Sequence, residues 1–202
     1  EVLPDNASTR LIKVLLRRRW HSSLYAIEQS LRGMASEEAD FGRDSGESAA
    51  SDTYEVTDML PVLSDVGPAV TASRIVLELL EQVTDDSKWV TCESLLRSMC
   101  SEEDRDVVIF TNFVDTAEYI SNLAQDSGWE TELFTGPPDA AMIGGASPIA
   151  RSGHRILVYT ATAAYGLNLT FTNQVIDYDV PEDPAALLQR FGLVEGIGSP
   201  FN

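Results

Sequence analysis

Short apolar runs alternate with helical stretches in the second half of the chain. The run at 107–111 is apolar up to its last residue, which is typical of a strand buried on both faces of a parallel sheet. Apolar residues at helical spacing separate the runs, and Pro184 suits the first turn of the last helix. The expected strands are 107–111, 130–135, 155–160 and 173–179, and the expected helices between and after them are 116–124 and 184–191.

This order of elements predicts an α/β domain with a mainly parallel sheet flanked by helices. Ligands of such sheets bind at the carboxyl ends of the strands. We therefore expect the site at Thr111-Asn112, Thr135-Gly136, Thr160-Ala161 and Tyr178-Asp179.

The first half of the chain has a different pattern. Residues 8–34 carry apolar residues at helical spacing, which predicts an amphipathic helix or helix pair, with Ser22 or Ser23 capping the second part. Six bases against the single acid Glu28 give this segment a local net charge of +5. Its triplet Arg17-Arg18-Arg19 fits a solvated face with stems lying along apolar surface, or a surface that docks DNA or a partner. Two more helices are expected around 72–80 and 88–99.

Residues 35–66 carry nine acids and one base, which accounts for −8 of the total net charge of −18. Few apolar residues accompany them up to about residue 57, so we expect a flexible acidic insertion. The expected organisation is a basic helical segment at 1–34, the insertion at 35–66 and an α/β lobe at 67–202. An acidic chain repels phosphates and does not suit a free-standing nucleic-acid binder. Adaptation to salt and an arginine-favouring genome remain alternative explanations of the charge.

Several classes of protein are excluded or disfavoured. No apolar run approaches the roughly 20 residues of a membrane span. The amino terminus lacks a start methionine and a signal peptide pattern, which suggests a piece of a longer protein. Cys92 and Cys100 fit neither a disulfide framework nor a zinc site, so we expect reduced thiols in the cytoplasm, at the nucleoid if the source is prokaryotic, and no bound metal.

The carboxyl-terminal third carries three ordered motifs. They are "YTATAAYGLNL" at 159–169, "VIDYDVP" at 175–181, and "QRFG" at 189–192 followed by "IGSP" at 197–200. In order and spacing they resemble motifs five and six of superfamily-two helicases, most closely the Swi/Snf-related and RapA-like branch. Upstream, "VVIFTNFVDTAEYISNLA" (107–124) resembles motif four, and "LFTG" (133–136) the next strand with its glycine turn. "DSKW" (86–89) resembles the D-x-K that opens the first helix of this lobe. "LLRRRWHSSLYAIEQSLR" (15–32) resembles the helix that joins the two RecA-like halves.

The resemblance implies a RecA-like lobe that helps to clasp ATP and grips nucleic acid, with double-stranded DNA as the expected form. It implies nucleotide-facing roles for Gly166, Asn168, Gln189 and Arg190, of which Arg190 is the catalytic candidate. It implies nucleic-acid contacts for the strand-end residues Thr111, Thr135, Gly136 and Thr160, beside the basic triplet Arg17, Arg18 and Arg19. No G-x-x-x-x-G-K-[ST] loop occurs in the chain, so ATP and Mg²⁺ are expected only together with an N-terminal RecA-like lobe.

The chain departs from the family pattern at positions that carry chemistry. Leu193 and Gly196 stand where motif six has two arginines, and neither replaces a guanidinium. Three hypotheses follow. The chain is a second motor lobe, or a degenerate lobe kept as a protein-interaction or regulatory module, or, least in keeping with the motifs, an unrelated α/β nucleotide-binding or receiver-like domain.

Overall fold

The computed structural model describes residues 7–36, 67–102, 106–137, 155–164, 167–181 and 183–195. The chain divides into two compact units, Glu1–Asp86 and Ser87–Asn202, which we call the helical unit and the α/β unit. Of the expected acidic insertion, residues 37–66 lie outside the described residues. No helix in the described ranges is long and apolar enough to cross a membrane.

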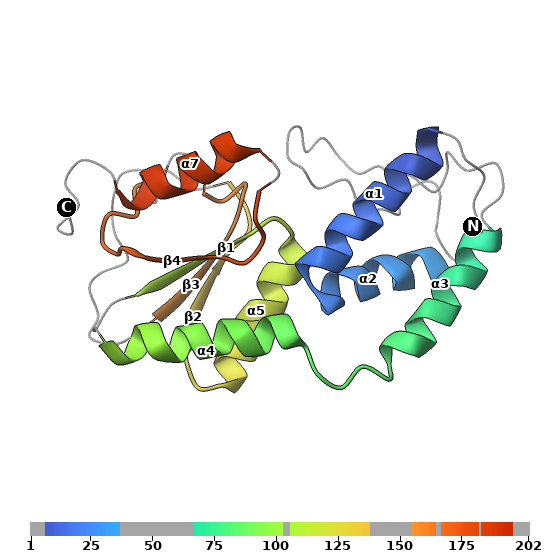
Figure 1. The fold of residues 1–202 in the computed structure, drawn as a ribbon, viewed down its shortest axis with the longest axis horizontal. Coiled ribbons are helices and arrows are strands. Elements are labelled where there is room, and N and C mark those ends of the chain that lie inside the picture. The colour runs from blue at the N-terminus through green and yellow to red at the C-terminus, as the bar shows by residue number, and fades with distance from the viewer. Residues whose placement is uncertain are drawn as a thin grey trace. The chain divides into compact units, whose positions relative to one another are not determined.

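The helical unit contains α1 (Ala7–Ser22), α2 (Leu24–Ala35) and α3 (Gly67–Leu80) (Figure 1). The expected helix pair is confirmed, and Ser23 caps α2 by accepting a hydrogen bond from the Ala26 backbone N at 3.0 Å. The sequence-based limits place residues 67–80 with the α/β lobe, whereas α3 packs against α2 in the structure. A guanidinium NH of Arg74 on α3 donates to the carbonyl of Ala35 at 3.4 Å.

The α/β unit confirms the predicted fold class and all four strands. Its sheet has the order β2-β3-β1-β4, and every neighbouring pair is parallel. In chain order the elements are α4 (Ser87–Glu102), β1 (Val107–Thr111), α5 (Val114–Asp126), β2 (Glu130–Phe134), β3 (Arg155–Thr160), β4 (Gln174–Asp177) and α7 (Pro184–Val194). Pro184 occupies the first turn of α7, and Asp183 caps this helix through the Ala185 backbone N at 2.9 Å.

The strands β1 and β3 lie in the middle of the sheet and are buried along their whole length. Side chains of a strand alternate between its two faces, so neighbouring residues enter different cores. Val107 and Ile109 pack with residues of α4 and α5, while Phe110 packs with residues that include Leu193 of α7. Figure 1 shows α4 and α5 on one side of the sheet and α7 on the other. The two expected free thiols are confirmed, with Cys92 buried and Cys100 half-buried.

The Tyr159 ring stacks on Phe134 at a centroid distance of 4.4 Å, in the core beneath α7. Burial, with a smaller contribution from the Glu132 carboxylate, raises the pKa of the Tyr159 phenol above its usual value of 10.0. The folded state therefore keeps this proton at pH values where the unfolded chain loses it. The corresponding stability is present below pH 10 and is lost as the pH rises above it.

We expect urea unfolding of the α/β unit to show a loss of stability above pH 10 that is smaller in Tyr159→Phe. The slope attributable to this residue is at most about 1.4 kcal/mol per pH unit. Phenylalanine keeps the stack on Phe134 and removes only the titrating hydroxyl. Equal slopes between pH 9 and 11 in both proteins would show that another group causes the loss.

Candidate functional site

The carboxyl ends of the strands meet at one edge of the sheet, as expected for parallel strands. The residues of this edge are joined through Asp179, which is 7% exposed. Its Oδ2 accepts hydrogen bonds from Thr111 Oγ1 at 2.5 Å and from the Asn112 backbone N at 3.0 Å. Its Oδ1 forms an ion pair with Lys88 Nζ at 3.0 Å. One buried carboxylate thus connects the ends of β1 and β4 with the first turn of α4.

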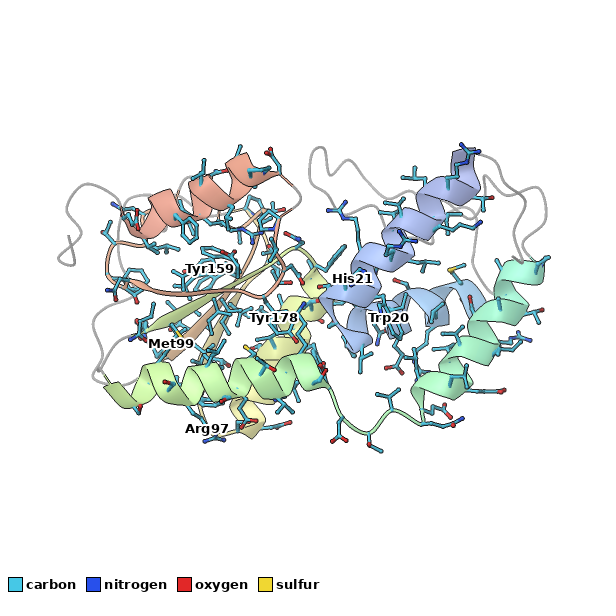
Figure 2. The ribbon with its side chains drawn as sticks, viewed as in Figure 1. Trp20, His21, Arg97, Met99, Tyr159 and Tyr178 are labelled. Carbon is cyan, nitrogen blue, oxygen red and sulfur yellow. The ribbon has the colours of Figure 1, made fainter. Side chains whose placement is uncertain are left out.

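Lys88 has a second contact at this edge. Its ammonium lies 4.1 Å from the ring centroid of Tyr178, close enough for a cation–π interaction (Tyr178 is labelled in Figure 2). The D-x-K pattern at 86–88 thus places a lysine that holds the start of α4 on the residues after β4.

Arg190 of α7, the catalytic candidate, lies inside the α/β unit with 4% exposure. Its Nη1 donates to Asp177 Oδ1 at 2.6 Å and to the Asp179 carbonyl at 3.1 Å. Its Nη2 donates to Asn112 Oδ1 at 2.8 Å, and its Cζ lies 5.4 Å from the Phe110 ring centroid. This guanidinium therefore fastens α7 to the ends of β1 and β4. Its neighbour Gln189 is exposed.

The predicted strand-end contacts divide into buried and accessible residues. Thr111 is 0% exposed and Thr160 3%. Both hydroxyls donate inside the unit, Thr111 to Asp179 and Thr160 to the Thr135 carbonyl at 3.1 Å. In this arrangement they hold the edge together rather than present hydroxyls to a phosphate. Thr135 is half-buried and Gly136 exposed, so these two remain accessible.

The structure also describes two further motif positions, Asn168 and Leu193. Asn168 is exposed, and its Oδ1 accepts from the Thr170 backbone N at 3.2 Å, which makes a local turn. Leu193 is 9% exposed and belongs to the core on the α7 side, where its carbonyl accepts from the Leu169 N at 2.8 Å. Leucine at this position therefore extends the core as well as removing a charge. Gly166 and Gly196 lie outside the described residues.

The basic triplet of α1 does not form one surface. Arg17 is exposed and Arg18 half-buried, whereas Arg19 is 4% exposed. The Arg19 Nε donates to the Ala26 carbonyl at 3.1 Å, across the α1–α2 turn. Arg19 therefore does not share an exposed surface with Arg17, because consecutive helical residues point in different directions.

Lys88 was missing from the predicted site, whereas Asn112 and Asp179 were predicted only as strand-end positions without a role. The available signal was their position, since Asn112 and Asp179 each follow a strand and Lys88 opens a helix. Asp177 and Asp179 each pair with a cation, Arg190 and Lys88 respectively. In the described part of the chain, no group of three or more His, Cys, Asp or Glu residues is placed to hold a metal ion.

Gly192 lies in the motif-six helix α7, where a substitution can test stability and activity separately. A Cβ added there would meet no atom within 4 Å in this chain. We expect Gly192→Ala to stabilise the α/β unit by about 0.5–1 kcal/mol, because glycine disfavours helix interiors. Urea unfolding measures this, and a stability loss would show that the position is constrained within the chain. If ATP hydrolysis falls in a longer protein while stability rises, the glycine serves a close approach to another lobe.

The structure is thus a parallel α/β domain with polar motif residues gathered at the carboxyl edge of its sheet. The family model "Helicase conserved C-terminal domain" matches residues 87–194, which is more than half of the chain. The chain belongs to this family.

Curated relatives match the chain over parts of their length. The uncharacterized ATP-dependent helicase YqhH of Bacillus subtilis (strain 168) is 28% identical over 142 residues, which cover 69% of this chain and 25% of that protein. The ATP-dependent RNA helicase dbp8 of Sclerotinia sclerotiorum is 36% identical over 95 residues, covering 46% of this chain and 18% of that protein. The chain thus spans a quarter or less of these two relatives.

Among solved structures, the C-terminal part of the Fun30 ATPase domain has a similar fold. The TM-score is 0.52 at 16% sequence identity, with 98% of this chain and 70% of that chain covered. At this identity the likeness shows the fold alone.

Proposed function

We propose that the chain is the second, C-terminal motor lobe of an ATP-dependent helicase or translocase, and that it works only together with an N-terminal RecA-like lobe. The observation that carries this proposal is the network around Arg190, which holds the motif-six helix α7 against the carboxyl edge of the sheet. Gln189, next to Arg190, is left exposed beside this edge. A residue of α7 that contacts a ligand bound between two lobes can do so only if this helix is held in a fixed position.

In this proposal the N-terminal lobe supplies the phosphate loop and the acidic residues for Mg²⁺, and Gln189 faces the shared ATP. Arg190 acts by positioning α7 rather than by touching the nucleotide. Thr135 and Gly136 are the accessible strand-end residues for a nucleic-acid backbone, with double-stranded DNA as the proposed form. The Swi/Snf-related or RapA-like branch is the proposed assignment within the family, supported by the motif pattern at 159–200.

One observation favours the second candidate, a degenerate lobe that binds protein. Leu193 is buried in the core, so the motif-six position of an arginine has become structural. Large apolar side chains also lie exposed on α7 and before it, with Val180 at 75%, Leu188 at 71% and Phe191 at 41%. An exposed apolar surface of this kind fits a protein partner, which in the motor proposal is the other lobe.

The test is ATP hydrolysis with and without DNA, by this chain alone and by a longer protein that includes the N-terminal lobe. The motor proposal expects DNA-stimulated hydrolysis from the longer protein and none from this chain. Gln189→Ala in the longer protein is expected to lower the stimulated rate at least tenfold, while Glu118→Ala, at an exposed position of α5, serves as control. Absence of hydrolysis from the longer protein, with its phosphate loop intact, would favour the degenerate lobe.

Restoring the family's arginine at position 193 is expected to destabilise the α/β unit. Leu193→Arg places a guanidinium in the core, and we expect the free energy of unfolding to fall by about 2–3 kcal/mol. Leu188→Arg is the matched control, since this side chain is 71% exposed and the change is expected to stay within about 0.5 kcal/mol. Unchanged stability in Leu193→Arg, together with faster hydrolysis by the longer protein, would instead identify 193 as a former catalytic position.

A further inference from the structure

A row of basic side chains runs along one face of α1. Arg10, Lys13 and Arg17 are separated by three and four residues, which places them on one side of a helix, and all three are exposed. Trp20 continues the same spacing and is 48% exposed. We call these four residues the basic stripe. On the other side of α1, Ile12, Leu15 and Arg19 are buried.

The helix pair itself offers little negative charge to the basic stripe. Between residues 7 and 36 the only acid is Glu28. Its carboxylate accepts from Arg32 Nη2 at 2.5 Å and from Arg32 Nε at 2.9 Å, so it is already paired on α2. The net charge of −18 belongs to the whole chain, whereas residues 8–34 carry a local net charge of +5, and salt at 0.1 M screens charges that lie more than about 10 Å apart.

Trp20 adds a different chemistry at one end of the row. Figure 2 shows Trp20 and His21 near the carboxyl end of α1. A large aromatic ring beside cations is the combination that binds single strands, because bases stack on the ring while cations neutralise phosphates. A paired duplex keeps its bases stacked internally and offers the ring no such face.

We propose that the basic stripe binds a single-stranded segment of nucleic acid. The seven-residue step from Arg10 to Arg17 is about 10 Å along the helix axis, so the cations form a short row along which the backbone of a single strand can lie. Lys13 and Arg17 neutralise phosphates, and Trp20 stacks on an adjacent base. The proposal rests on the proposed function only for nucleic acid as the kind of ligand. The single-stranded form is specific to the basic stripe, since duplex DNA is assigned to the motor motifs. An acidic protein segment is the rival partner, but it gives no reason for Trp20.

Fluorescence anisotropy of labelled oligo(dT), read with the complete 202-residue chain at several salt concentrations, tests the proposal. Lys13→Ala/Arg17→Ala is expected to weaken binding at least tenfold at low salt. The slope of log affinity against log salt is expected to fall by about 1.4, that is, about 0.7 for each phosphate that is no longer neutralised. Trp20→Ala is expected to weaken binding at least fivefold, with little change in that slope.

Arg32→Ala is the matched control, because it removes an exposed arginine of the same unit that is paired with Glu28. It is expected to leave affinity for oligo(dT) within twofold. Equal losses in Arg32→Ala and in the stripe variant would overturn the proposal. So would duplex binding as tight as oligo(dT) binding with no effect of Trp20→Ala, or tighter binding of a labelled polyglutamate peptide.

The same measurements separate this inference from the proposed function. Hydrolysis by the longer protein tests the motor lobe, and oligo(dT) binding by this chain tests the basic stripe. A longer protein that hydrolyses ATP normally, combined with unchanged binding in the stripe variants, would overturn the inference alone. If the longer protein does not hydrolyse ATP but oligo(dT) binding by this chain still depends on the basic stripe, only the motor assignment is overturned.

Discussion

Replacing Arg155 with methionine is expected to lower the free energy of unfolding of the α/β unit by about 3–5 kcal/mol. The Arg155 side chain is 3% exposed and lies at the amino edge of the sheet. Its Nη2 pairs with Asp106 Oδ2 at 2.5 Å, and its Nε donates to Asp106 Oδ1 at 3.1 Å. Its Nη1 reaches Glu132 Oε1 at 3.0 Å. Methionine fills much of the volume but leaves two carboxylates without their cation.

The Asp106 carboxylate has little other compensation. It is 11% exposed, and its Oδ1 also accepts from the Arg155 backbone N at 3.2 Å. The hydrogen bond with Asp106 is the largest cause that raises the pKa of Arg155 above its usual value, so the arginine is charged throughout the usable pH range. Glu132 is 36% exposed and relaxes into water more easily. Glu132→Gln is therefore expected to cost much less, about 1 kcal/mol or below.

Urea unfolding measures this prediction. Trp89 and Trp129 belong to the α/β unit, so their fluorescence in a Trp20→Phe background reports this unit. Arg74→Met, in the helical unit, is the control for an arginine removed outside the network and is expected to leave this transition unchanged. An Arg155→Met protein that unfolds within about 0.5 kcal/mol of wild type would show that the buried network adds no stability.

Replacing Arg190 with methionine is expected to have a similar cost in stability, about 3–5 kcal/mol, because Asp177 then loses its buried cation. Two further acceptors, the Asp179 carbonyl and Asn112 Oδ1, also lose their donor. Arg190→Lys is expected to recover only part of this stability. An ammonium keeps the charge but does not span three acceptors as a planar guanidinium does.

The neighbouring residue separates positioning from direct contact with the nucleotide. Gln189→Ala is expected to change the free energy of unfolding by no more than about 0.5 kcal/mol, since the side chain is exposed. In a longer protein it is nevertheless expected to lower ATP hydrolysis. If Arg190→Met leaves stability unchanged and abolishes hydrolysis, the guanidinium leaves this network during turnover and contacts ATP itself.

Local sequence predicted the elements of the α/β unit closely. Strands buried on both faces are marked by unbroken apolar runs, and β1 and β3 coincide with the predicted 107–111 and 155–160. Helix starts were also readable, because Ser23 and Pro184 have local preferences that need no distant partner. The strand 173–179 was predicted too long by one residue at its start and two at its end, since Tyr178 and Asp179 already take part in the edge network.

The roles of single polar residues were less predictable. Arg17, Arg18 and Arg19 are equivalent as letters, but only Arg19 faces α2 and is buried. Thr111 and Thr160 end strands where ligands usually gather, yet their hydroxyls close hydrogen bonds within the unit. The sequence shows that leucine stands at 193 where the motif has an arginine, but only the structure shows that this leucine lies in the core.

The sequence by itself determined the fold class, the order of elements and the membership of a helicase lobe, because apolar periodicity, caps and motif spacing are local properties of the chain. Tertiary structure alone decided which charges pair. Asp179 meets Lys88 and Thr111 across 91 and 68 residues of sequence, and Arg190 meets Asn112 across 78. Such pairs form because the parallel strands end at one edge of the sheet. Burial at this edge makes it costly for either charge to lose its partner.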